Sequence, residues 1–394
     1  MGMEKFKNFV QEHQNKAKKI LGFGIARVDL GKNQKILCAT YPVLNWQENF
    51  GSYAVFDTCK QYAKNIQQES NEEIFSITDS FINHALELFA SFLAEANSNP
   101  QSHKNIQVLL QLKQILQKPL ESHVDYRLVF LYEDLNCKSV ETAYMKLLAL
   151  SLGKAKLRSL NLDGIFGLLS NVAWSGNKPY ELDYLRENEI ALKLNGDYPH
   201  IDFVDKFPRY LMQVIPQYDN IRLLDTAKTR FGAYLGKGGY TQMPGASYVN
   251  FNAGVEGACM NEGRISSSVI IGEGSDVGGG ASILGVLSGG NSDPISIGKN
   301  CLLGVNSSTG ISLGDGCIVD GGIAVLAGTI FEISPQEAKK LQEINPNFAL
   351  HENNLYKGKE LSKLNGIHFR QDSKNGKMIA FRSNREITLN KDLH

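Results

Sequence analysis

The sequence predicts a mixed α/β N-terminal domain, followed by a left-handed parallel β-helix of hexapeptide repeats and a small β-rich C-terminal cap. The first observation behind this prediction is an aliphatic residue that recurs every six positions between Ile265 and Thr329. The second is a small residue four positions after each aliphatic one. A glycine often follows the aliphatic residue directly, as expected at tight corners. The third is that this rhythm is absent from residues 1 to about 220.

The period of six determines the architecture of the middle domain. It is seen in Ile271-Gly-Glu-Gly-Ser275, Leu303-Gly-Val-Asn-Ser307 and Leu313-Gly-Asp-Gly-Cys317. A helix repeats every ~3.6 residues and a strand every ~2, so neither element explains this spacing. A repeat of short strand and tight turn does explain it, because it points each aliphatic residue inward and stacks into a three-sided coil with a continuous core.

We place the α/β domain at residues 1–220, the β-helix at 221–330 and the cap at 331–394. Apolar spacing in the first domain predicts helices at residues 6–20, 79–96, 105–117, 140–152 and 202–214, and strands at 22–28, 35–40 and 127–132. In the cap, Ser334 is a candidate N-cap of a helix that extends to Gln342. Asn375-Gly376 indicates a hairpin whose turn has positive φ at both positions.

Composition excludes several classes of function. The 394-residue chain has 41 basic and 41 acidic residues and 42% hydrophobic residues, so we expect no nucleic-acid surface. No apolar run approaches the roughly 18 residues that span a bilayer, so we expect no membrane partner. The N-terminus lacks the apolar core of a signal peptide, and the six cysteines form no CxxC pair. We therefore expect a cytoplasmic protein.

Histidine is missing from the part of the chain that forms the coil. All eight histidines lie outside residues 201–350, which excludes a histidine base on the coil itself and the carbonic anhydrase variety of this fold. The catalytic group must then be a carboxylate or come from another segment.

Glu262 is the best candidate among the coil carboxylates. It lies where the sixfold rhythm stops after Val255, before it resumes at Ile265, and Arg264 follows it by two positions. From 231 to 330 the only other cations are Lys237 and Lys299. Arginine offers a planar fork for a substrate carboxylate. The same pair is equally well explained as a local ion pair at a kink, and spacing alone does not decide between the two interpretations.

Several motifs in this region carry a resemblance to a known family. They are Asn250-Phe-Asn-Ala-Gly254, Asn261-Glu-Gly-Arg-Ile-Ser266, Gly274-Ser-Asp-Val-Gly-Gly-Gly-Ala-Ser282, Ile295-Ser-Ile-Gly-Lys299 and Leu303-Gly-Val-Asn306. The chain resembles the longer branch of the tetrahydrodipicolinate N-succinyltransferases. The resemblance implies a homotrimer with active sites between neighbouring coils. It implies succinyl-CoA as cosubstrate with no permanently bound cofactor, and L-2-amino-6-oxopimelate, the ring-opened acceptor of the succinylase route to diaminopimelate and lysine.

The resemblance also implies roles for individual residues. Glu262 matches the catalytic glutamate, which acts either as a general base or as a nucleophile that forms an acyl anhydride. Arg264 matches a succinyl-CoA contact, and the other matching positions along the acyl-CoA groove are Gly279, Ser282, Val305, Asp320, Gly321, Gly328, Lys357, Arg370, Gln371, Asp372 and Ser373. The stretch Met243–Tyr248 lacks the carboxylates through which some members hold magnesium, so we expect no metal.

Two alternatives are open at this stage. One is an acetyltransferase on the same kind of coil that acts on an amino sugar or nucleotide sugar. The other is a non-catalytic trimerisation scaffold that displays the α/β half to partners. The Glu-Gly-Arg motif weighs against both, because a sugar acetyltransferase usually needs a coil histidine and a scaffold needs no such polar pair.

Overall fold

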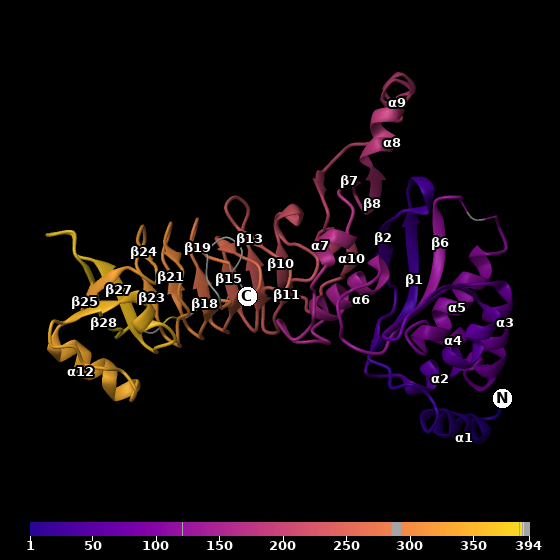
Figure 1. Ribbon diagram of the computed structural model, residues 1–394, viewed down its shortest axis with the longest axis horizontal. Coiled ribbons are helices and arrows are strands. Elements are labelled where there is room, and N and C mark those ends of the chain that lie inside the picture. Colours follow the sequence, from indigo (N-terminus) through magenta and orange to yellow (C-terminus); the bar gives the residue numbers. More distant parts are fainter. Residues whose placement is uncertain (120, 286–292, 386, 388, 390–394) are drawn as a thin grey trace. The chain divides into compact units, whose positions relative to one another are not determined.

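The computed structural model describes residues 1–119, 121–285, 293–385, 387 and 389. This described part of the chain forms two compact units, one of residues 1–149 with 160–208 and one of residues 150–159 with those from 209 onward. Figure 1 shows an α/β arrangement in the first unit and a coil of short strands in the second. The predicted fold class is confirmed: the coil has about five turns and is consistent with a left-handed β-helix of hexapeptide repeats.

The first unit is built on an antiparallel sheet whose strand order is β2-β1-β6-β5-β4, with β3 paired to β1. The strands are β1 (Gly22–Leu30), β2 (Ile36–Thr40), β3 (Asn45–Trp46), β4 (Lys64–Gln68), β5 (Glu72–Ser76) and β6 (Val124–Leu131). The helices are α1 (Met3–Gln14), α2 (Phe50–Cys59), α3 (Asp79–Leu88), α4 (Leu93–Ser98), α5 (Lys104–Ile115) and α6 (Val140–Ser151), with short turns η1 (Lys32–Gln34), η2 (Lys60–Tyr62) and η3 (Ala90–Phe92).

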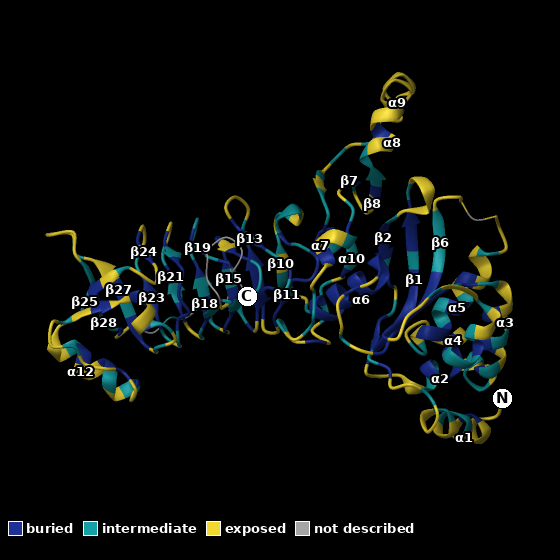
Figure 2. Ribbon diagram, viewed as in Figure 1, coloured by how far each residue is buried: buried dark blue, intermediate teal, exposed yellow. Residues whose placement is uncertain are grey.

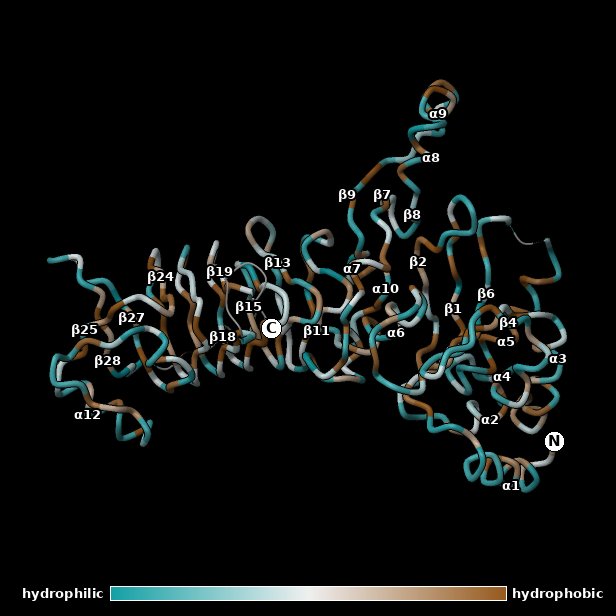
Figure 3. The backbone as a smooth tube through the Cα atoms, viewed as in Figure 1, coloured by the Kyte–Doolittle hydropathy of each residue, from teal (hydrophilic) through white to brown (hydrophobic). Residues whose placement is uncertain are grey.

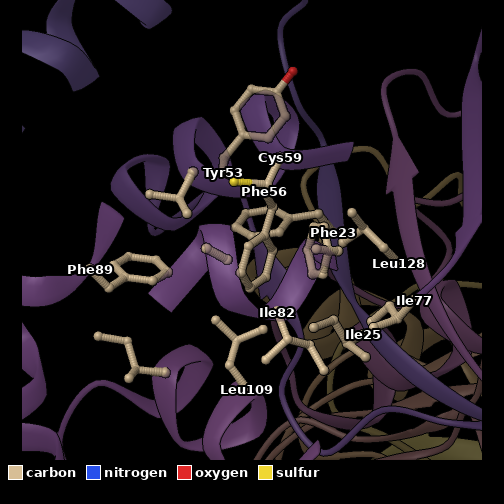
Figure 4. Close-up of a cluster of buried hydrophobic side chains, with 14 of the residues drawn as sticks. Phe23, Ile25, Tyr53, Phe56, Cys59, Ile77, Ile82, Phe89, Leu109 and Leu128 are labelled. Atoms are coloured by element: carbon tan, nitrogen blue, oxygen red, sulfur yellow. The ribbon is translucent and has the colours of Figure 1, made fainter. Parts of the chain in front are cut away.

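An aromatic core joins this sheet to its helices. Phe23 of β1 and Phe130 of β6 pack with Phe56 of α2 and Phe81 of α3, and all four are at most 1% exposed. Figure 4 labels Phe23 and Phe56 within this core. Figure 2 shows the central strands of the sheet in dark blue, in agreement with their burial.

Residues 160–208 add a small sheet with the order β8-β7-β9. Its elements are α7 (Ile165–Leu168), β7 (Val172–Ser175), β8 (Lys178–Glu181), α8 (Leu182–Glu187), α9 (Glu189–Asn195) and β9 (Phe203–Asp205). The prediction of one helix over residues 202–214 is wrong, because β9 pairs with β7 and helix α10 is limited to Tyr210–Gln213. Pro208 lies between them, and proline disfavours helical backbone in the residue before it.

In the described part of the second unit, three stacks of parallel strands form the walls of the coil. Figure 1 shows the successive turns following one another along the coil. The first wall contains β10 (Ile221–Leu223), β12 (Tyr240–Gln242), β15 (Cys259–Asn261), β18 (Ser275–Val277), β21 (Leu302–Leu303) and β23 (Ile318–Val319). The second contains β13 (Tyr248–Val249), β16 (Arg264–Ile265), β19 (Ser282–Ile283), β22 (Ser308–Thr309) and β24 (Ala324–Val325). The third contains β11 (Tyr234–Leu235), β14 (Gly254–Val255), β17 (Ile270–Ile271) and β20 (Ser296–Ile297), and a short turn, η4, spans Thr226–Lys228.

The interior of the coil corrects the position of the predicted break in rhythm. Asn261 lies in register with Val277, Leu303 and Val319, and these four side chains are at most 1% exposed. The inward column is therefore continuous at position 261, where a polar residue takes the place of an aliphatic one. The rhythm shortens only afterwards, because the next inward residue, Ile265, follows Asn261 by four positions instead of six.

Polar inward residues support both shortened corners of the coil. Asn261 donates from Nδ2 to the Tyr240 hydroxyl at 3.1 Å, and its Oδ1 accepts the Gly263 N–H at 3.0 Å. Thr309, which precedes the second four-residue step to Leu313, donates to the Ile311 carbonyl at 3.0 Å. These side chains satisfy backbone groups that a shortened corner would otherwise leave buried without partners.

Arg158 ties residues 150–159 to the coil. Its backbone N–H donates to Asn252 Oδ1 at 2.8 Å, and its guanidinium donates to the Ser268 carbonyl at 2.6 Å and to Ser296 Oγ at 2.9 Å. Burial lowers the pKa of this guanidinium. Through its backbone and its side chain together, this one residue connects three successive turns of the coil, a role that the sequence did not suggest.

The cap closes the last turn of the coil. It contains β25 (Ile330–Glu332), α12 (Pro335–Ile344), β26 (Leu355–Lys357), η5 (Gly358–Leu361), β27 (Ile367–Gln371) and β28 (Met378–Arg382). Ser334 is the N-cap of α12, as predicted, and β27 extends the first wall by pairing with β23. The β27–β28 hairpin is confirmed, but its turn is wider than predicted: only Gly376 of the pair Asn375-Gly376 has positive φ.

We predict that Asn261→Ala destabilises the protein, because it leaves the Tyr240 hydroxyl and the Gly263 N–H buried without partners. Each unsatisfied group costs about 1–3 kcal/mol. The measurement is the thermal unfolding midpoint, with Met260→Ala, on the outward side of the same strand, as the control. An unchanged midpoint in Asn261→Ala would show that the shortened corner does not depend on this side chain.

Candidate active site

Glu262 lies on the outer surface of the coil at the first shortened corner. Side chains alternate along β15, so that Asn261 points inward and the side chains on either side of it point outward. The Glu262 N–H donates to the Val277 carbonyl at 2.8 Å, and its carbonyl accepts the Gly280 N–H at 3.1 Å. The backbone of this corner is therefore fixed to the next turn of the coil, while the partly exposed carboxylate extends away from it.

On the two turns that follow Glu262, the residue at the equivalent position is a glycine and carries no side chain. The ladder of backbone hydrogen bonds places Gly278, Gly304 and then Asp320 below Glu262. Strands of a sheet lie ~4.8 Å apart, so Glu262 and Asp320 are separated by about 14 Å. A Cβ atom added at Gly278 would lie 2.6 Å from the Leu303 carbonyl oxygen, and one at Gly304 would lie 2.5 Å from the Gly321 nitrogen, so successive turns stack closely at these two positions. No side chain from either glycine stands between the carboxylate at one end and the charged cluster at the other.

Gly279 opens space directly beside the Glu262 carboxylate. A Cβ atom added at Gly279 would lie 3.7 Å from Glu262 Oε2 and 3.9 Å from a methyl of Val305. Val305 is 58% exposed, which is unusual for an aliphatic residue in the coil, and it packs near Gly321 on the following turn. Gly279, Val305 and Gly321 thus follow one another on successive turns and form a small, partly apolar surface that begins beside Glu262.

Arg264 and Ser282 lie in register on the neighbouring wall. They occupy β16 and β19, with Ser308 next in the column. Arg264 is exposed, and no ion pair joins it to Glu262 among the described residues, so the structure does not support a local ion pair at the kink. Ser282 Oγ is buried and has no hydrogen-bond partner in the described chain.

Asp320 anchors a charged cluster at the other end of this row of equivalent positions. It accepts hydrogen bonds from Arg370 Nε at 2.6 Å and from His368 Nε2 at 2.7 Å, both on β27 of the cap. Burial acts to raise the pKa of Asp320, but the hydrogen bonds from Arg370 and His368 outweigh it, and the net pKa is lowered. Phe381 of β28 packs against both the imidazole and the guanidinium.

The remaining residues implied by the resemblance are dispersed over the cap. Lys357 is exposed on β26 opposite Ile330, close to the turn that contains Gly328. Gln371 and Asp372 hold the β27–β28 turn: Gln371 Nε2 donates to the Gly376 carbonyl at 3.0 Å, and Asp372 Oδ1 accepts the Lys374 N–H at 2.9 Å. Ser373 is exposed in the same turn. The structure thus gives Gln371 and Asp372 a structural role in the hairpin.

A second carboxylate lies close to Glu262. Asp276 of β18 is in register with Met260 of β15, which places its side chain on the same outward face as Glu262. Burial first, and the Glu262 carboxylate second, raise the pKa of Asp276 above its ordinary value. A neighbouring like charge disfavours the ionised form of a carboxyl group, so Asp276 binds a proton more readily than an isolated aspartate does.

Among the described residues no group of three or more His, Cys, Asp or Glu side chains is arranged to hold a metal ion. No helix in the described ranges has the length and apolar character needed to cross a membrane.

Comparisons with known proteins identify the family. Residues 4–167 match the family model "Tetrahydrodipicolinate N-succinyltransferase N-terminal", residues 169–209 the corresponding "middle" model, and residues 294–327 the "Hexapeptide repeat of succinyl-transferase". A Helicobacter pylori protein named 2,3,4,5-tetrahydropyridine-2,6-dicarboxylate N-succinyltransferase is 65% identical over 400 residues, which cover 100% of each chain. The Campylobacter jejuni protein of the same name is 51% identical over 97% of this chain and 96% of its own.

The chain belongs to the tetrahydrodipicolinate N-succinyltransferase family. A crystal structure from Campylobacter jejuni, described as a 2,3,4,5-tetrahydropyridine-2-carboxylate N-succinyltransferase, agrees with a TM-score of 0.90 at 49% identity. That likeness covers 98% of this chain and 99% of the other. The family resemblance drawn from the coil motifs is therefore confirmed.

Membership in the family leaves two residues of this surface that the sequence did not point to. His368 was set aside because it lies outside the coil, yet β27 brings it into the first wall beside Asp320. Asp276 was passed over because its position in the repeat gave no sign of its neighbour. Treating Asn261 as an inward residue aligns it with Val277, and this register places Asp276 opposite Met260, two residues before Glu262.

We predict that Gly279→Ala folds normally but loses activity. Gly279 has no positive φ and an added methyl group meets only ordinary contacts, so the change should leave stability unaltered or raise it by about 0.4–1 kcal/mol. The methyl group would occupy the space beside the Glu262 carboxylate, and we expect the rate of acyl transfer to fall by about tenfold or more. The measurements are unfolding midpoint and CoA release.

Gly167→Ala is the matched control, since an added Cβ there meets nothing within 4 Å. Full activity in Gly279→Ala would show that the space beside Glu262 is not used by a ligand.

Proposed function

We propose that this protein transfers the succinyl group of succinyl-CoA to the amine of L-2-amino-6-oxopimelate, the ring-opened form of tetrahydrodipicolinate. The products are N-succinyl-2-amino-6-oxopimelate and CoA, in the succinylase branch of diaminopimelate and lysine synthesis. The full-length identity of 65% to a relative with this named activity carries the proposal. The fixed backbone at Glu262, with space beside its carboxylate at Gly279, supports placing the reaction there.

In this proposal Glu262 removes a proton from the acceptor amine as its nitrogen attacks the thioester carbonyl. A positioned carboxylate that does so contributes typically about 10²–10⁴ in rate. The other interpretation, in which Glu262 attacks the thioester and forms a transient anhydride, uses the same position. Arg264 pairs with the succinyl carboxylate, and the unpartnered Ser282 hydroxyl donates to the thioester oxygen.

Succinyl-CoA follows the row of small residues away from Glu262. Gly279, Val305, Gly321 and Asp320 line the path of the pantetheine arm, and Gly328 continues it. Lys357 and Arg370 serve the CoA phosphates, with Gln371, Asp372 and Ser373 shaping the turn beside them. Succinyl-CoA enters as a cosubstrate, and we propose no permanently bound cofactor and no metal.

We also propose a homotrimer, in which the site is completed by the coil of a neighbouring subunit. Large apolar side chains left exposed on α9 support an interface with another copy: Ile190 is 77% exposed and Leu194 82% exposed. They lie four positions apart and so share one face of the helix. Figure 3 shows hydrophobic colour along the tube at α9. In this proposal residues 221–330 form the catalytic domain, and residues 1–220 and 331–394 form the flanking domains. We propose that the protein acts in the cytoplasm.

Glu262→Gln tests the catalytic assignment. The amide keeps the shape of the side chain but cannot accept the proton, so we expect turnover to fall by about 10²–10⁴ while binding of CoA persists. CoA release reports turnover, and calorimetry reports binding. Glu273→Gln, which removes the same charge from an exposed corner of the coil, should keep full activity. Intact-mass analysis after rapid quenching of the wild type with succinyl-CoA alone separates the two chemical roles, because only an anhydride adds a succinyl group to the protein.

Arg264→Lys tests the identity of the acyl group. Lysine keeps the charge but loses the planar fork, so we expect kcat/KM with succinyl-CoA to fall by about tenfold, corresponding to ~1.4 kcal/mol. The slow reaction with acetyl-CoA, which has no carboxylate to pair, should be unchanged. Equal losses with both donors, or a wild-type preference for acetyl-CoA, would favour the sugar acetyltransferase alternative.

A further inference from the structure

The proposed reaction has a proton balance that one carboxylate does not satisfy. An aliphatic amine is an ammonium ion at neutral pH, and it must lose one proton before its nitrogen has a lone pair for attack. The nitrogen then loses a second proton after the new C–N bond forms, so that a neutral amide results. A single carboxylate accepts one proton at a time, which makes a second acceptor near Glu262 chemically useful.

Asp276 is placed to be that acceptor. Met260 and Asp276 face each other across β15 and β18, and Glu262 follows Met260 by two positions, so Glu262 and Asp276 are diagonal neighbours on one face. Such neighbours have Cα atoms about 7–8 Å apart, within reach of one small substrate group. Gly278 and Gly279, directly after the strand, add no side chain that would cover either carboxylate.

Nothing in the described chain gives Asp276 a structural role. Among the described residues its carboxylate forms no ion pair and no side-chain hydrogen bond, although it is only partly exposed. Aspartate is also disfavoured in strands, and a partly buried carboxylate without a partner costs stability. A group maintained under these conditions beside a candidate catalytic residue is more simply explained by function than by packing.

Given the proposed N-succinyl transfer, on which this step rests, we propose that Asp276 is a second catalytic carboxylate and takes the first proton from the acceptor's ammonium group. The free amine then attacks the thioester carbon, the C–N bond forms and the carbonyl electrons move to oxygen. Glu262 takes the second proton from nitrogen as the carbonyl reforms and the C–S bond breaks. The CoA thiolate leaves and takes up one of these protons, and the other passes to solvent.

Few titratable groups among the described residues lie close enough to Asp276 to influence its protonation. The titratable groups that face it are Glu262 and the buried Cys259 thiol, both in or next to β15, and the facing residue on β21 is Leu302. Burial and Asp276 itself raise the pKa of that thiol, so it stays protonated in the working range. Glu262 is therefore the group whose charge is coupled to that of Asp276.

The experiment is the pH profile of kcat/KM for 2-amino-6-oxopimelate at saturating succinyl-CoA, followed by CoA release. In the Asp276→Asn variant, only the fraction of acceptor molecules whose amine is already unprotonated can react. We expect kcat/KM to fall by about 10² near neutrality and then to rise about tenfold per pH unit up to the pKa of the amine. Asp276→Glu, which keeps the carboxylate, should retain the shape of the wild-type pH profile with lower values of kcat/KM. Glu273→Gln should match the wild type in the shape of the profile and in kcat/KM.

Each outcome is decisive. An Asp276→Asn profile that runs parallel to the wild type, whether lowered or not, overturns the role of Asp276 while the succinyl transfer itself stands. The same conclusion follows if Asp276→Glu falls to the level of Asp276→Asn with an altered shape. A wild-type protein that releases no CoA with this acceptor rejects the proposed function, and the inference with it. Unfolding midpoints of the variants confirm that the rates refer to folded protein.

Discussion

The coil depends on one constraint: each turn must place its inward side chains directly over those of the turn before. Parallel pairing in strict register enforces this, from Val277 to Leu303 to Val319 along the first wall. The same register controls the outer surface. Each outward position has an equivalent position ~4.8 Å away on the next turn. Glycines at equivalent positions of successive turns therefore line up in a row. In the same way, Glu262 and Asp276 become neighbours because Asp276 faces Met260, two residues before Glu262. The site is thus a consequence of the repeat, not an addition to it.

The corner at Glu262 shows how the repeat makes room for chemistry. Its step of four residues instead of six shortens this turn by two residues, and Asn261 supports the shortened corner through hydrogen bonds to the Tyr240 hydroxyl and the Gly263 N–H. A polar residue at an inward position is otherwise unfavourable. The cost is met by hydrogen bonds that hold the backbone on both sides of Glu262. The backbone that carries the Glu262 carboxylate is therefore already in place when a substrate arrives, which favours preorganisation.

Sequence reasoning captured the parts of this protein that follow from local pattern. The period of six gave the coil, and the sequence Asn261-Glu-Gly-Arg264 gave both the family and the candidate catalytic residue. It misplaced the break in rhythm because it sought an aliphatic residue at 261, and it missed His368 because that residue reaches the coil through the pairing of β27 with β23. A helix over 202–214 was expected from apolar spacing, but β9 formed there by pairing with β7. Each miss concerns a long-range contact that no local pattern records.

The absence of histidine from residues 201–350 takes on a different meaning once the register is known. An imidazole accepts one proton near neutrality, and a lone carboxylate is a weak base for an ammonium group because its ordinary pKa is near 4. A carboxylate that is partly buried beside another one is a stronger base than an isolated one: burial first, and the Glu262 carboxylate second, raise the pKa of Asp276. A coil produces such pairs by placing carboxylates at neighbouring outward positions of successive turns. A coil without histidine can therefore strengthen a carboxylate base by stacking acids.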